Sequence, residues 1–64
     1  MIITEKGKYR TLKEFTDRGP ISIGTVLADR IIEITQIDKN NHKVIGPQLS
    51  DWIYWDLPVE KVDL

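Results

Sequence analysis

The sequence predicts a mostly β fold: a small barrel or roll of four to five short strands, with one short N-terminal helix. Its 64 residues are too few for more than one domain, so residues 1–64 are expected to form a single unit. The chain contains ten Ile, four Val and five Thr but a single Ala, and β-branched side chains suit a pleated, half-buried surface better than a helix. Turn-forming residues also divide the apolar segments into short lengths.

The N-terminal part of the chain is expected to hold an arm and the helix. Residues 1–10 are interpreted as an arm or a short strand with a polar turn. Residues 11–19 are predicted to form a helix of about two turns, because Thr11 precedes Glu14 by the spacing of a capping box. The Gly-Pro pair at 19–20 ends this helix, since proline cannot continue it.

Residues 21–37 fit two periodicities, one typical of strands and one typical of an amphipathic helix. We prefer strands, because Gly24 interrupts the helical pattern and the segment is rich in β-branched residues. This interpretation gives one strand at 23–28 and a second at 31–37, with a turn or bulge at 29–30 between them. Residues 21–64 would then form the barrel.

The C-terminal strands are separated by turn signals. Asp-Lys-Asn-Asn at 38–41 predicts the tip of a hairpin, because Asp and Asn side chains bond to nearby backbone. The return strand is expected at 42–45 and is stopped by a Gly-Pro pair. An aromatic strand at 52–55 follows, and a turn at 57–59 leads into a closing strand at 61–64.

The predicted order of elements resembles that of the SH3-like small barrels. The resemblance is based on Gly24 to Leu27, the 38–41 tip and residues 52–62. The resemblance covers residues 21–64 and concerns the fold alone. Barrels of this kind are similar to ones found in small phage and mobile-element proteins. The resemblance therefore implies a small phage-encoded protein that modulates a host protein.

A second resemblance implies a different fold and function. Thr11 to Phe15 followed by Ser22 to Val26 resembles the opening of the α+β winged-helix domains of excisionases and MerR-type regulators, which implies a recognition helix at 22–34 in a DNA-binding accessory factor. We place this alternative second, because Arg30 is the only cation of that helix, whereas phosphate and base contacts need several donors. The residues that would bind nucleic acid are Lys6, Lys8, Arg10, Lys13, Arg18 and Arg30.

Trp52, Tyr54 and Trp55 form the most distinctive cluster in the sequence. On a strand, neighbouring side chains point to opposite faces, so at least one aromatic face is expected to stay partly exposed. Trp and Tyr are enriched at binding hot spots, and here Asp51 and Asp56 border them. These five residues are the predicted protein-binding site, suited to a basic or Pro-rich partner segment.

Other classes of function are disfavoured by the composition. Without cysteine and with a single His, the sequence offers no disulfide, thiolate or histidine-based metal site, and no nucleophile with a supporting base is evident. We therefore expect neither an enzyme nor a cofactor. The absence of cysteine suits a reducing cytoplasm, where we expect the protein to lie. The chain lacks a long apolar run, so we expect no membrane partner, and self-association is a further possibility.

Overall fold

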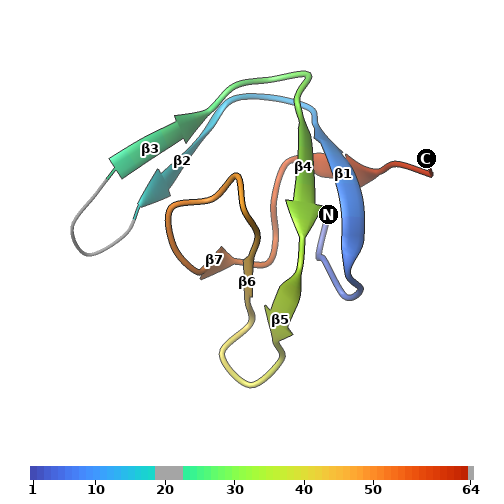
Figure 1. The fold of residues 1–64 in the computed structure, drawn as a ribbon, viewed down its shortest axis with the longest axis vertical. Coiled ribbons are helices and arrows are strands. Elements are labelled where there is room, and N and C mark those ends of the chain that lie inside the picture. Colours follow the sequence, from blue (N-terminus) through green and yellow to red (C-terminus); the bar gives the residue numbers. More distant parts are fainter. Residues whose placement is uncertain (19–22, 64) are drawn as a thin grey trace.

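Eight short strands make up the regular structure of a computed structural model that describes residues 1–18 and 23–63 (Figure 1). The part of the chain that it describes contains no helix, and so none long and apolar enough to cross a membrane. The strands are β1 (Gly7–Thr11), β2 (Phe15–Arg18), β3 (Ile23–Val26), β4 (Ile31–Ile34), β5 (Gln36–Asp38), β6 (Lys43–Ile45), β7 (Ile53–Tyr54) and β8 (Val59–Lys61).

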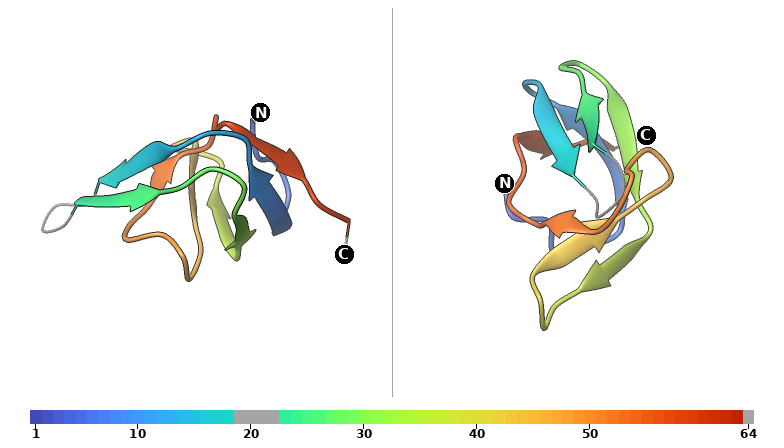
Figure 2. Two further views of the ribbon diagram at one scale, coloured as in Figure 1. Left: turned by 90° about the horizontal axis from the view of Figure 1, so that it is seen from above. Right: turned by 90° about the vertical axis from the view of Figure 1, so that its left-hand side faces the viewer.

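The strands form three small antiparallel sheets. In the first sheet β1 lies between β4 and β8, and in the third sheet β6 lies between β5 and β7. β2 and β3 pair only with each other and extend to one side of the molecule (Figures 1 and 2). Thr35 alone separates β4 from β5, so one continuous stretch of chain connects the first sheet to the third.

The N-terminal residues close one side of the molecule by pairing with the segment between β7 and β8. The backbone amide of Ile3 donates to the carbonyl of Trp55 at 2.9 Å, and the amide of Leu57 donates to the carbonyl of Met1 at 3.0 Å. Ile3 itself is fully buried. The predicted N-terminal arm therefore contributes Ile3 and Tyr9 to the core, and its last residues belong to β1.

A single cluster of buried apolar side chains forms the core. In β4 the burial alternates, with Ile32 and Ile34 inside and Ile31 outside, as a strand with one covered face requires. Partly buried side chains of Phe15 and Val26 pack against the cluster from the β2–β3 hairpin. The buried members among the described residues are Ile3, Tyr9, Ile32, Ile34, Val44, Leu49, Ile53, Leu57 and Val59.

Thr11, at the end of β1, organises the connection from β3 to β4. Its side chain is 1% exposed, and its hydroxyl donates to the carbonyl of Leu27 at 2.7 Å and accepts from the amide of Arg30 at 2.8 Å. The backbone of Thr11 adds two bonds of 2.8 Å, one to the carbonyl of Arg30 and one from the amide of Asp29. Asp29 adopts a φ of 59°, a conformation that Asp tolerates better than most residues. Residues 27–30 are thus folded around one threonine.

The loop after β6 presses closely on β4. Gly46 is buried, and a Cβ atom at this position would overlap the backbone carbonyl oxygen of Glu33. Two residues further on, the side-chain oxygen of Gln48 accepts a hydrogen bond of 3.0 Å from the amide of Glu33. The absence of a side chain at Gly46 is what lets the loop approach the edge of β4.

The predicted helix at 11–19 is wrong. Thr11 ends β1, residues 12–14 form a bend and β2 begins at Phe15, while residue 19 lies outside the described residues. The hydroxyl of Thr11 is taken by the 27–30 loop instead of capping a helix. Pairing with β3 supplies backbone partners along β2, whereas an isolated helix of two turns is unstable in water.

The winged-helix alternative is also wrong, because the described part of its recognition helix, residues 23–34, consists of β3, β4 and the loop between them. Ser22 lies outside the described residues. Our preference for strands in the middle of the chain is confirmed there, although β3 and β4 end earlier than the predicted strands.

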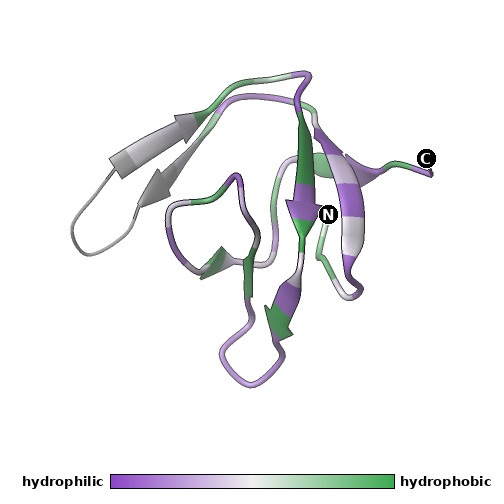
Figure 3. Ribbon diagram, viewed as in Figure 1, coloured by the Kyte–Doolittle hydropathy of each residue, from purple (hydrophilic) through white to green (hydrophobic). Residues whose placement is uncertain are grey.

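The C-terminal elements agree with the predicted order but differ at their ends. The 38–41 turn joins β5 to β6 as a hairpin, and its polar tip and apolar return strand are visible in Figure 3. The aromatic strand is shorter than predicted, because only residues 53–54 pair with β6. The closing strand lies at 59–61 and not at 61–64.

We expect Thr11→Val to lower the free energy of unfolding by about 2 kcal/mol, because the buried hydroxyl is replaced by a methyl group of similar shape, and the partly buried amide of Arg30 and carbonyl of Leu27 each lose a hydrogen-bond partner. The matched control is Thr16→Val, at an exposed position of β2, with an expected change within about 0.5 kcal/mol. Urea unfolding followed by tryptophan fluorescence measures both. Equal losses for the two variants would contradict the role given to Thr11.

Candidate functional site

The outward face of the third sheet carries a row of three side chains. Register pairs Asp38 with Lys43 and Lys43 with Tyr54, so these residues lie side by side across β5, β6 and β7. Their neighbours Val44 and Ile53 point the other way and are buried in the core. Tyr54 is 59% exposed, the highest value among the exposed large apolar or aromatic side chains of the described residues. We call Asp38, Lys43 and Tyr54 the outer row.

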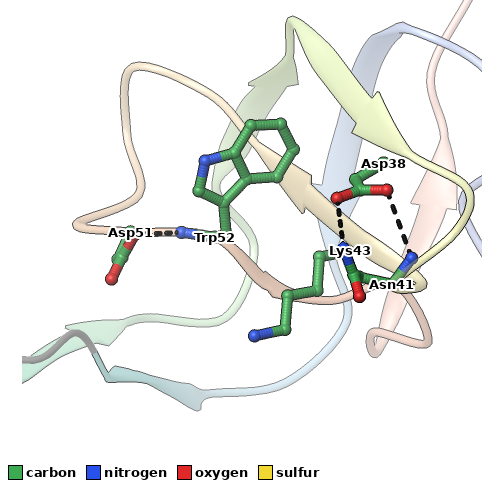
Figure 4. A pocket seen from close by; sticks show the side chains of 5 residues that line it. All are labelled: Asp38, Asn41, Lys43, Asp51 and Trp52. Carbon is green, nitrogen blue, oxygen red and sulfur yellow. Dashed lines mark hydrogen bonds between the residues drawn. The ribbon is translucent and has the colours of Figure 1, made fainter.

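A hollow of about 270 Å³ adjoins the outer row. We call it the Trp52 hollow; Asp38, Asn41, Lys43, Asp51 and Trp52 line it (Figure 4). The carboxylates of Asp38 and Asp51 lie on either side of the half-buried Trp52 side chain, and the Lys43 ammonium points away from the indole ring. Asp38 and Lys43 belong to both features, so the hollow and the outer row form one continuous surface.

The hairpin tip is held in shape by Asp38. Its Oδ1 accepts from the amides of Asn40 at 3.1 Å and Asn41 at 3.2 Å, and its Oδ2 accepts from Nδ2 of Asn41 at 2.8 Å. These bonds, above all the one from the Asn41 side chain, and the nearby Lys43 ammonium hold the pKa of Asp38 below its usual value. Asp38 is therefore a carboxylate at neutral pH, with its side chain fixed in direction.

Trp55 lies apart from the Trp52 hollow. It is half-buried and packs against the core, and its ring stacks on His42 with a centroid distance of 4.6 Å and an interplanar angle of 20°. The amide of Trp55 donates to the carbonyl of His42 at 2.9 Å, and His42 adopts a φ of 58° at the end of the hairpin turn. The stack joins the base of the hairpin to the core.

The structure thus brings together only part of the predicted protein-binding set. Asp51 and Trp52 line the hollow, and Tyr54 adjoins it through Lys43. Asp56 does not line the hollow; it forms an isolated antiparallel bridge with the N-terminal segment. Trp55 packs against the core and does not line the hollow.

Sequence reasoning missed three lining residues, Asp38, Asn41 and Lys43. The sequence pattern indicates only a turn at Asp38 and Asn41. The loop between β6 and β7 brings Asp51 and Trp52 close to this turn, and no local sequence pattern predicts the path of that loop. Lys43 was not singled out. The predicted hairpin contained one usable signal, since pairing the return strand with the aromatic strand would have set Lys43 opposite an aromatic residue.

The cations of the nucleic-acid alternative are interspersed with acids. Lys8 pairs in register with Glu33, and the Arg10 guanidinium reaches Asp29 at 3.3 Å and Glu60 at 2.9 Å. A phosphate-binding face needs cations that are free to replace counterions, and these contacts reduce that freedom. Lys6, Lys13 and Arg30 are exposed, and the side chain of Arg18 lies outside what the structure describes. This arrangement gives no support to a DNA-binding function.

The described residues contain no group of three or more His, Cys, Asp or Glu side chains placed to hold a metal ion. In comparisons with known proteins, no protein-family model, curated protein or solved structure matched the chain. The functional proposal therefore rests on the geometry of the Trp52 hollow and the outer row.

The two tryptophans are expected to differ in their contribution to stability. Trp55→Ala should lower the free energy of unfolding by about 3 kcal/mol, because it removes a ring that packs on the core and on His42. Trp52→Ala should cost about 1 kcal/mol, since its ring borders a surface hollow. Urea unfolding followed by circular dichroism compares them. If Trp52→Ala proved the more damaging, Trp52 would be a core residue and the hollow would lose its significance.

Asn41→Ala should raise the pKa of Asp38 towards the ordinary value for Asp, because it removes the side-chain hydrogen bond that lowers this pKa most. The matched control is Asn40→Ala, which keeps the backbone bond that Asn40 donates. Carboxyl-carbon NMR titration measures the pKa in each variant.

The sign of the effect on stability follows from the direction of this shift. A pKa that is lower in the folded state stabilises the fold above the unfolded-state pKa, and this contribution disappears as the pH falls through the folded-state value. Asn41→Ala should therefore weaken the pH dependence of unfolding in the acidic range. An unchanged Asp38 titration would show that Asn41 does not set the charge of the tip.

Proposed function

We propose that this chain is a non-catalytic interaction module that binds a protein partner through the Trp52 hollow and the outer row. The observation that supports this most directly is the position of two aromatic side chains. Tyr54 is 59% exposed, and Trp52 lines a hollow. In so small a domain we would expect a large aromatic ring to be buried in the core, where it stabilises the fold most. Exposed aromatic residues beside a hollow are typical of binding hot spots.

Contacts within the chain hold this surface in shape, which favours binding. Asp38 fixes the hairpin tip through three hydrogen bonds, and Ile53 is buried directly before Tyr54 in β7. A partner would therefore lose its own freedom on docking but would not have to order this side of the interface. The two carboxylates favour a partner segment that carries positive charge or exposes proline.

We further propose that the fold is a small SH3-like barrel. The continuous stretch from β4 to β5 joins two three-stranded sheets, and the first and last strands pair with each other, as closure of a small barrel requires. The resemblance also suggests a phage-encoded modulator of a host protein, for which small size is suitable. A cysteine-free composition agrees with a cytoplasmic setting.

Selection from a displayed library of random peptides tests the binding function. The wild-type protein should enrich peptides whose affinity falls at least tenfold on Tyr54→Ala, because hot-spot aromatics commonly contribute more than about 1.4 kcal/mol. Leu12→Ala is the matched control, because Leu12 is 55% exposed but lies outside the hollow and the outer row. Absence of enrichment, or equal binding to Tyr54→Ala and the wild type, would refute the proposal.

A further inference from the structure

We infer that the Trp52 hollow receives an arginine side chain of the partner, with the guanidinium group over the Trp52 indole and between the carboxylates of Asp38 and Asp51. This inference rests on the proposed binding function and specifies the chemical group that the surface recognises. It is supported by three features of the hollow, namely its charge, its free hydrogen-bonding positions and its aromatic wall.

The charge of the hollow favours a cation. Asp38 and Asp51 contribute two negative charges and Lys43 one positive charge, so the lining is net negative by one. The Lys43 ammonium points away from the indole ring, and it forms no ion pair among the described residues (Figure 4). Two carboxylates in the lining would therefore repel an anion in the hollow, whereas a cation there would find complementary charge.

The free hydrogen-bonding positions call for a donor with several N–H groups. A carboxylate offers about four acceptor positions. In the part of the chain that the structure describes, Asp38 accepts three hydrogen bonds within the hairpin tip, and Asp51 accepts one from the amide of Trp52 at 2.7 Å. Asp51 is thus the carboxylate with the greater capacity for a ligand. Asp38, with its direction fixed and its pKa lowered, supplies a charge and a single further acceptor position.

The aromatic wall distinguishes arginine from lysine. A guanidinium group is planar, is weakly hydrated and stacks on an indole face while its edges still donate hydrogen bonds. An ammonium group is compact and strongly hydrated, so it loses more on entering a hollow that one aromatic ring borders. A proline ring also packs on indole, but it has no N–H group that could donate a hydrogen bond to either carboxylate. The combination of Trp52 with Asp51 therefore favours arginine.

Titration of the ¹⁵N-labelled protein with capped Gly-Gly-Arg-Gly-Gly tests the inference by NMR. The Trp52 indole signal and the amide signals of the lining residues should shift together and saturate, with millimolar affinity. The same peptide with lysine should bind at least threefold more weakly. The citrulline peptide, which has the shape of arginine without its charge, should not saturate these signals.

Asp51→Asn should weaken arginine binding about tenfold, because it removes a charge-assisted partner while its side-chain oxygen can still accept from the Trp52 amide. The matched control is Asp63→Asn, the same change of charge at an exposed position outside the hollow, which should alter the affinity less than twofold. The amide spectrum of each variant reports whether the fold is kept.

Three results would each overturn the inference: equal binding of the arginine and citrulline peptides, signal shifts confined to another surface, or undiminished arginine binding by Asp51→Asn. Peptides from the library selection separate this failure from failure of the binding function. If selected peptides depend on Tyr54 but contain no arginine that matters to their affinity, the module binds a partner and the arginine inference is wrong. If no peptide is selected and the arginine peptide does not bind, both proposals are wrong.

Discussion

Thr11 makes four hydrogen bonds, and the rest of the structure depends on them because they fix where β4 begins. Its side chain and backbone hold residues 27–30, the loop that follows the β2–β3 hairpin. This loop brings the chain back to β1, beside which β4 begins. β4 then pairs with β1 with its isoleucines facing inward, and the same stretch continues into β5. A one-residue slip would turn Ile32 and Ile34 towards solvent, which a core this small would not survive.

The candidate site is a consequence of the same alternation on the third sheet. Burial of Val44 and Ile53 in the core leaves Lys43 and Tyr54 on the outward face. The polar tip then adds Asp38 to that face, where its hydrogen bonds hold it in one orientation. Core packing and the proposed binding chemistry are therefore set by neighbouring residues of the same strands, and a partner meets a surface whose shape is already determined.

The sequence contained enough information to predict extended structure from residue 23 onwards, but neither β2 nor the site. The β-branched composition, the 38–41 turn and the strand before it are local signals, and the structure confirms the hairpin and the extended middle of the chain. The capping spacing at Thr11 was misleading, because a buried threonine hydroxyl serves a distant loop as well as it serves a helix start. The approach of Asp51 to Asp38 depends on a loop path, which no periodicity encodes.

Gly46 has a consequence that reaches beyond the single molecule. Because it lacks a side chain, the loop after β6 covers the outer edge of β4, and Gln48 occupies the amide of Glu33 that would otherwise be open. An isoleucine-rich strand with a bare edge is a template for pairing with other copies of the same chain. The fit of this loop thus guards the protein against aggregation as well as completing its fold.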